Sequence, residues 1–232
     1  MKEQAVIVLA LLVLLTACKT NDHASDKSSI LPTPMTAKPT PISGPVNYVA
    51  LGDSTGSGVG AREGGYVARL FRRILAHRPE SKLTNLCVSG ATTSDVLRDQ
   101  LDRGISAKPN LVTLGIGIND IGHGVSLEEF SRNYEQILAK LKSNTTAAIV
   151  VTNIPDISSA PRIPALVRNQ YQHLIIEFNR KLEEIASRHQ VIVFDVYTVT
   201  HEQLPSHPEY FSADGFHPSD QGYELWAEQM WP

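Results

Sequence analysis

A serine that could act as a nucleophile lies directly after the first apolar run of this sequence that predicts a β-strand. Residues 46–51 are rich in Val and Tyr, and this strand ends at Gly52-Asp53-Ser54. In an open parallel sheet, ligands bind at the carboxyl ends of the strands, so a serine in this position would meet them. Three glycines within the next six residues would let a substrate come close. Ser54 is therefore either a nucleophile or a hydroxyl that binds a phosphate.

A histidine and an aspartate near the C-terminus could complete a catalytic triad with this serine. A serine hydroxyl is a poor nucleophile unless a base removes its proton, and an imidazole is a suitable base near neutral pH. His217 could be this base, and Asp214, three residues earlier, could reach its other ring nitrogen. Ser54, Asp214 and His217 thus have the residue types of a nucleophile, an orienting carboxylate and a base.

Attack by Ser54 would place negative charge on the carbonyl oxygen of a substrate, and the sequence offers hydrogen-bond donors for that charge. Gly90 follows a predicted strand at residues 83–88, and Asn119 follows another at 111–115. The backbone N–H groups of Ser54 and Gly90 and the side-chain amide of Asn119 predict an oxyanion hole. Losing one such donor typically slows an enzyme about 100- to 1,000-fold.

The elements that must position these residues alternate along the chain. Short apolar runs predict five strands, and amphipathic segments between them predict helices, the longest of them at 165–189. This alternation is typical of a three-layer α/β/α sandwich with a five-stranded parallel sheet, for which we expect the flavodoxin-like order 2-1-3-4-5. Residues 198–217 are expected to form a long loop at the same edge of the sheet as Ser54. Segments 154–164 and 201–211 are expected to wall the cleft.

Four blocks of this sequence resemble those of the SGNH (GDSL-type) hydrolases. They are, in order, Gly52-Asp53-Ser54, Gly90, Gly117-Ile118-Asn119-Asp120 and Asp214-Gly215-Phe216-His217. The blocks follow the family's order from residue 46 to the C-terminus. Thr55 departs from the family's name motif, which has leucine at this position.

The resemblance implies roles for five residues and a reaction. Ser54 would be the nucleophile, His217 the base and Asp214 its orienting partner, with Gly90 and Asn119 as oxyanion donors. The family hydrolyses esters or thioesters through an acyl-enzyme, with no metal and no cofactor. Members of similar length and layout are acyl hydrolases of the lysophospholipase and arylesterase types.

Two other functions stay open at this point. An acyltransferase or deacetylase that acts on glycan O-acyl groups would use the same triad. A flavodoxin-like FMN-binding module would instead use residues 54–58 as a phosphate loop, although it would not need Asp214 or His217. Residues 52–56 also fit the G-x-S-x-G elbow of α/β-hydrolases, but here they follow the first strand, which argues against that fold.

The N-terminus predicts export and a lipid anchor. Residues 5–15 form an apolar run that is too short for a membrane-spanning helix, and Leu15-Thr16-Ala17-Cys18 resembles the lipobox of bacterial lipoproteins. Residues 1–17 would then be a lipoprotein signal peptide and Cys18 the lipid-modified N-terminus. A plain secretory signal is the alternative. Residues 18–45, rich in Ser, Thr and Pro, are expected to be a disordered tether before a hydrolase domain at 46–232.

The composition of the chain excludes some classes of binding partner and scaffold. A net charge of −3 and no Lys/Arg cluster argue against binding to nucleic acid, and two cysteines are too few for a disulfide scaffold. We expect a monomer that meets a small-molecule, lipid or glycan ester substrate and is bound to a membrane through Cys18. It would lie in the bacterial cell envelope, outside the cytoplasm. Lys19, where aspartate is associated with inner-membrane retention, favours an outer membrane if the cell has one.

Overall fold

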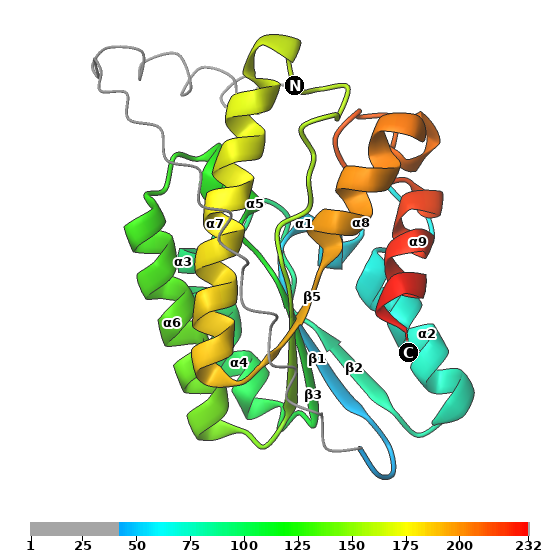
Figure 1. The fold of residues 1–232 in the computed structure, drawn as a ribbon. Helices are drawn as coiled ribbons and strands as arrows, with labels where there is room; N and C mark the ends of the chain where they lie inside the picture. Colours follow the sequence, from blue (N-terminus) through cyan, green and yellow to red (C-terminus); the bar gives the residue numbers. More distant parts are fainter. Residues whose placement is uncertain (1–41, 232) are drawn as a thin grey trace.

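The computed structural model describes residues 42–231. The predicted signal peptide, the lipidation site at Cys18 and nearly all of the predicted tether lie outside these residues. Five parallel strands form the central sheet in the order β2-β1-β3-β4-β5, which confirms the predicted topology (Figure 1). The strands are β1 (Asn47–Gly52), β2 (Lys82–Asn85), β3 (Leu111–Gly115), β4 (Ala148–Thr152) and β5 (Ile192–Phe194).

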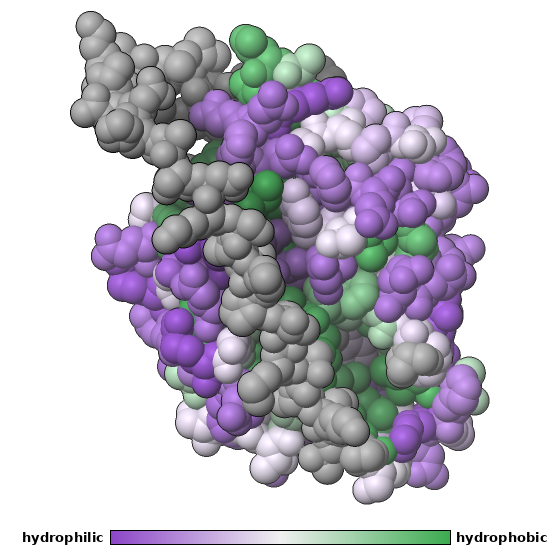
Figure 2. All heavy atoms as spheres, viewed as in Figure 1, coloured by the Kyte–Doolittle hydropathy of each residue, from purple (hydrophilic) through white to green (hydrophobic). Residues whose placement is uncertain are grey.

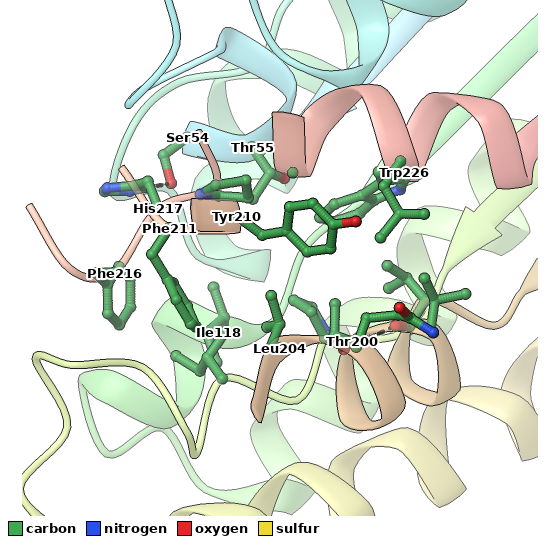
Figure 3. A pocket seen from close by; sticks show the side chains of 18 residues that line it. Ser54, Thr55, Ile118, Thr200, Leu204, Tyr210, Phe211, Phe216, His217 and Trp226 are labelled. Carbon is green, nitrogen blue, oxygen red and sulfur yellow. Dashed lines mark hydrogen bonds between the residues drawn. The ribbon is translucent and has the colours of Figure 1, made fainter. Parts of the chain in front are cut away.

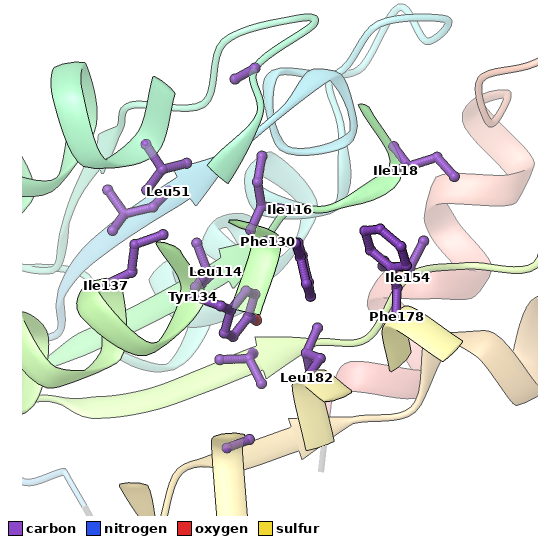
Figure 4. Packing of buried hydrophobic residues seen from close by; sticks show 14 of the residues in the cluster. Leu51, Leu114, Ile116, Ile118, Phe130, Tyr134, Ile137, Ile154, Phe178 and Leu182 are labelled. Carbon is purple, nitrogen blue, oxygen red and sulfur yellow. The ribbon is translucent and has the colours of Figure 1, made fainter. Parts of the chain in front are cut away.

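Helices cover both faces of this sheet, as the alternating pattern predicts. One face packs against α4 (Leu101–Ser106), α6 (Leu127–Asn144) and α7 (Arg168–His189), and the other against α2 (Tyr66–His77) and α9 (Asp220–Met230) (Figure 1). The apolar sides of α6 and α7 meet β3 in the larger core, where Leu114, Phe130, Ile137, Phe178 and Leu182 are buried together (Figure 4). Hydrophilic residues cover most of the outer face seen in Figure 2.

A buried arginine joins the two helices of the smaller core. Arg69 on α2 pairs with Asp220 and Glu224 on α9, each at 2.6 Å, and its side chain is only 4% exposed. Tyr66 of α2 also stacks on Trp226 of α9, with ring centroids 5.1 Å apart. Helix α9, which follows directly after the predicted base, is therefore held firmly against the sheet.

The end of β1 is held by backbone contacts and one side chain. Gly52 has a φ of +147°, and a Cβ atom placed on it would lie 2.2 Å from the carbonyl oxygen of Gly115 on β3. Only glycine fits there. The buried Gln100 side chain accepts a hydrogen bond from Gly52 N at 2.8 Å and donates one to Gly52 O at 2.9 Å. Gln100 ends a π-helical turn, Val96–Gln100, between α3 (Thr93–Asp95) and α4, where the sequence predicts one plain helix at residues 94–103.

The predicted loop at residues 198–217 is the main error. Its first part is helix α8 (Val196–Gln203), followed by 3₁₀ turns at Leu204–Ser206 and Pro208–Tyr210. The residues at the start of α8 favour strands, which hides the helix. The Asp195 side chain overrides this preference, because it accepts hydrogen bonds from Thr198 N at 3.0 Å and from the Thr198 hydroxyl at 2.6 Å. The predicted fifth strand at 191–196 is correspondingly shorter.

The remaining short helices are α1 (Ser54–Ser57), α5 (Ile118–Gly122) and a 3₁₀ turn at Ala165–Val167. Strand β2 is also shorter than the predicted strand at 83–88, and beyond Asn85 the Cys87 N–H donates to the Asn85 side chain at 3.1 Å. Among residues 42–231, no helix combines the length and the apolar character needed to span a bilayer.

Candidate active site

Ser54 lies at the carboxyl end of β1, as expected, and begins helix α1. Asp53 is the N-cap of α1, and its side chain accepts hydrogen bonds from the backbone N–H and the hydroxyl of Thr55, both at 2.9 Å. Asp53 N donates in turn to Gly115 O of β3 at 3.3 Å. The turn that carries Ser54 is therefore tied to two neighbouring strands. Burial raises the pKa of the Asp53 carboxyl to about 6, although the hydrogen bonds from Thr55 and the charge of His217 oppose this rise.

The structure brings the three predicted triad residues into one hydrogen-bonded line, of which Figure 3 shows Ser54 and His217. His217 Nε2 lies 3.0 Å from Ser54 Oγ, and His217 Nδ1 lies 2.6 Å from Asp214 Oδ2. The other carboxylate oxygen of Asp214 accepts from the backbone N–H groups of Phe216 and His217, both at 2.9 Å, and from the Ser212 hydroxyl at 2.8 Å. The aspartate thus holds both the loop and the ring of its partner.

The charge state of Asp214 fixes the tautomer of this histidine. Partial burial alone would raise the pKa of Asp214, but the hydrogen bonds from the His217 ring and backbone, Ser212 and Phe216 outweigh it and lower the pKa to about 2. An ionised carboxylate can only accept hydrogen bonds, so Nδ1 of His217 carries a proton. In the neutral ring Nε2 is then free to accept the proton of the Ser54 hydroxyl.

The predicted oxyanion donors lie at the same edge of the sheet. Ser54 is the first residue of α1, so its N–H has no acceptor within the helix. Asn119, on α5 directly after β3, donates from Nδ2 to Ala91 O at 2.9 Å, which places its amide beside the turn that contains Gly90. Gly90 is exposed with a φ of +80°, and the space where a side chain would lie is open. Neither Gly90 nor Asn119 lines the pocket described below.

A buried aspartate, Asp120, stabilises the same edge of the sheet. Asp120, next to Asn119, is fully buried and accepts hydrogen bonds from the backbone N–H of Thr93 at 3.0 Å and from the Thr93 hydroxyl at 2.5 Å. Burial raises the pKa of Asp120 to about 6 against these hydrogen bonds. Asp120 therefore joins the turn after β3 to the start of α3, which follows the Gly90 turn.

A pocket with largely apolar walls begins at Ser54 and His217 and runs between α8 and α9 (Figure 3). The two expected wall segments do contribute to it, the first through Pro155 and Ile157 and the second through Gln203, Leu204 and aromatic residues after it. The wall that α8 provides was not predicted from the sequence. Val196, Val199, Thr200 and Gln203 line the pocket at helical spacing, and this spacing was the signal that could have revealed it.

A second pair of an aspartate and a histidine lies behind this wall. His201 Nδ1 is 2.8 Å from Asp156 Oδ2, and Gln172 of α7 donates to the same oxygen at 3.0 Å. Asp156 N also donates to the Thr200 hydroxyl at 2.8 Å. Within the described part of the chain, no group of three or more His, Cys, Asp or Glu side chains could hold a metal ion.

Comparisons with known proteins show which family this chain resembles. Residues 50–225 match the model of the GDSL-like lipase/acylhydrolase family. The chain is 30% identical to the spore germination lipase LipC of Bacillus licheniformis over 204 residues, which cover 80% of this chain and 94% of LipC. It is also 42% identical to Lipase 1 of Streptomyces coelicolor over 86 residues, about a third of each protein (32% and 31%).

Solved structures share the fold. The acetylxylan esterase Axe2 of Geobacillus stearothermophilus superposes with a TM-score of 0.67 at 22% identity, over 81% of this chain and 93% of Axe2. LAE5, an α/β hydrolase enzyme from the metagenome of Lake Arreo in Spain, gives a TM-score of 0.67 at 22% identity, over 82% and 94% of the two chains. With a family match over most of its length and the expected topology, this chain belongs to the GDSL-like lipase/acylhydrolase family.

Proposed function

We propose that this protein is a serine hydrolase that cleaves carboxylic esters or thioesters through an acyl-enzyme. The observation that carries the proposal is the continuous line from Asp214 through His217 to Ser54, with contacts of 2.6 and 3.0 Å. Catalytic mutants of Axe2 replace the same three residue types, a serine, an aspartate and a histidine. Thr55, where the family's name motif has leucine, also lines the pocket.

In the first step, Ser54 Oγ attacks the carbonyl carbon of the ester while His217 Nε2 takes the hydroxyl proton. The negative charge that forms on the carbonyl oxygen is met by the N–H groups of Ser54 and Gly90 and by the Asn119 amide. The ionised Asp214 stabilises the protonated ring. When the carbon–oxygen bond to the alcohol breaks, Nε2 returns the proton to the leaving alcohol. Water, activated by the same nitrogen, then releases the acid and restores the serine.

The decisive test is covalent labelling with a fluorophosphonate, together with hydrolysis of p-nitrophenyl butyrate. Ser54→Ala should abolish labelling and reduce hydrolysis by several orders of magnitude, because no other group takes over the attack. Ser57→Ala is the matched control, since Ser57 lies on the same short helix but is exposed, and its hydroxyl donates to the backbone oxygen Ser54 O. Labelling that survives in the Ser54 variant would contradict the proposal.

Two alternatives differ in what they require of this site. Transfer of the acyl group to a glycan hydroxyl would use the same residues, and product analysis with and without a glycan acceptor separates transfer from hydrolysis. The FMN-binding alternative gains no support, because residues 54–57 form a helix whose first hydroxyl bonds to His217.

The lipid anchor on Cys18 stays a prediction that metabolic labelling with palmitate can test, with Cys87 as the internal control.

A further inference from the structure

The pocket that begins at Ser54 is partly enclosed and largely apolar. Its side walls include Ile118, Leu204, Tyr210 and Phe211, and Figure 3 shows Leu204 directed into the space toward Tyr210. The far end is formed by the buried Val196 and by Trp226, which is fixed by its stacking on Tyr66. None of the described residues that line this space is an aspartate, glutamate, lysine or arginine, and away from Ser54 and His217 the polar groups come from Thr55, Thr200, Gln203 and Tyr210. A group with several hydroxyls or a charge would lose most of its hydrogen bonds against such walls.

The opposite side of the serine is open. Gly90 and its neighbours Val88 and Ser89 are exposed to solvent, and none of them lines the pocket. An ester whose carbonyl oxygen points to Gly90 and Asn119 would have one part in the partly enclosed pocket and the other part at the surface. One half of an ester substrate would therefore be enclosed by apolar walls, and the other half would be exposed to solvent.

The chemistry of natural esters decides which half enters the pocket. In lipids and glycans the alcohol half carries hydroxyl or phosphate groups, and burying these without partners is costly. The acyl half is a hydrocarbon chain, and each buried methylene strengthens binding about fourfold, equal to about 0.8 kcal/mol. An aliphatic acyl chain is therefore the half that this pocket accepts.

The size of the pocket sets a range of chain lengths. Its volume is about 50 Å³. This is about a third of the roughly 150 Å³ of an apolar cavity that holds one benzene molecule, and it is more than the methyl group of an acetyl ester fills, so the pocket suits a short chain. Longer chains would meet the fixed Trp226 at the far end.

We propose that this pocket binds the acyl chain and that the protein prefers short acyl groups of about four carbons over acetyl groups. The proposal rests on the ester hydrolase function proposed above. It separates this chain from Axe2, which is named an acetylxylan esterase, although the two share a fold. A shared fold does not fix the substrate.

The experiment measures kcat/KM for p-nitrophenyl esters from acetate to palmitate, so that the leaving group stays the same. We expect kcat/KM to rise about two- to fourfold per methylene to a maximum near butyrate, and to fall for long chains. Leu204→Trp, which fills the pocket, should lower the ratio of butyrate to acetate hydrolysis by about 4- to 16-fold, the gain from two methylenes. Leu204→Ala should move the maximum toward longer chains, which keeps the test valid if the tryptophan variant fails to fold.

Leu166 provides the matched control. Its side chain is 95% exposed and lies outside the pocket, so Leu166→Trp makes the same chemical change without touching the site. This variant should keep the wild-type chain-length profile.

Three results would overturn the proposal: a wild-type maximum at acetate, Leu204 variants with an unchanged profile, or a rate that follows the length of the alcohol in a series of acetate esters. Failure of the hydrolase function itself would be different, because no ester would be cleaved or the Ser54→Ala variant would still be labelled.

Discussion

Two aspartate–histidine pairs in this molecule have nearly the same contact and opposite surroundings. Asp214 and His217 lie 2.6 Å apart, and Asp156 and His201 lie 2.8 Å apart, in each case through Nδ1 of the ring. In the first pair the histidine side chain is the more buried member, 15% exposed against 35% for its aspartate. In the second pair the aspartate is 4% exposed and the histidine 52%.

The difference shows that the pair alone does not make a base. Nε2 of His217 faces the hydroxyl of Ser54, whereas the ring of His201 is stacked on Tyr197, with centroids 5.6 Å apart. The remaining hydrogen bonds of Asp214 stay within its own loop, while those of Asp156 reach α7 and, through its backbone, α8. The first pair orients a proton acceptor, and the second pair holds the pocket wall in place.

The largest effect should come from Asp214→Asn. The amide that replaces the carboxylate favours the wrong ring tautomer of His217, so kcat for an ester should fall roughly 10⁴-fold. The same change in the other pair, Asp156→Asn, should alter kcat by less than about threefold. Steady-state kinetics on both variants checks this contrast, and comparable losses of kcat in the two would show that the pairs are not functionally distinct.

A third carboxylate, Asp53, lies next to Ser54 in the sequence and is buried without a hydrogen bond to a histidine. Its folded pKa of about 6 lies above the unfolded value of 3.8, so its contribution to stability is present below about pH 4 and is lost as the pH rises through about 6. Between pH 4 and 7 this loss is on the order of 2–3 kcal/mol. Asp120, whose pKa burial also raises to about 6, adds a similar loss in the same window, so Asp53→Asn, which keeps an acceptor for Thr55, should remove roughly half of the pH dependence measured in urea unfolding. A variant with the wild-type slope would show that Asp53 does not cause it.

A smaller loss of stability is expected from the second pair. Asp156→Asn weakens a buried acceptor that also bonds to Ser158 N at 2.9 Å, and should lower the free energy of unfolding by about 1–3 kcal/mol at pH 7. His201→Gln, at an exposed position, should cost no more than about 1 kcal/mol. Chemical denaturation measures both. A larger cost for the histidine would mean that the ring, and not the carboxylate, holds the wall.

The smallest expected effect is on the free energy of unfolding at acidic pH. The pKa values of Asp214 and Asp156 are both lowered by their hydrogen bonds, against the opposing effect of burial. The stability that Asp214 contributes is present above its unfolded pKa of 3.8 and is lost as the pH falls through about 2. The acid limb of the unfolding curve between about pH 4 and 2 should therefore be shallower in Asp214→Asn. An unchanged limb would assign acid unfolding to other carboxyl groups.

The sequence predicts the first pair but not the second, and the reason is distance along the chain. Asp214 and His217 are three residues apart, so local geometry suffices to join them, and strand order then brings them to Ser54. Asp156 and His201 are separated by β5 and α7, and only the folded sheet brings them together.

The helices and strands that the sequence predicts correctly are likewise those that local sequence patterns determine. Strands β1 and β3 and helices α2 and α9 follow from apolar periodicity, which predicts helices at 66–77 and 220–230, the observed bounds of α2 and α9. Helix α8 was missed because its first residues favour strands, and one cap at Asp195 reverses that preference, although the apolar spacing of residues 196–203 is helical. The shape of the pocket depends on α8 and was missed with it. The oxyanion roles of Gly90 and Asn119 stay predictions, although both lie at the expected edge.

The contact between Gly52 and Gly115 has a practical consequence for engineering this protein. Because the two main chains touch directly, the height of Ser54 above the sheet does not depend on how the side chains of the core are chosen. The interior could be redesigned extensively for thermal robustness without displacing the reactive oxygen. A single methyl group at Gly52 would instead force the central pair of strands apart and shift that oxygen away from its imidazole.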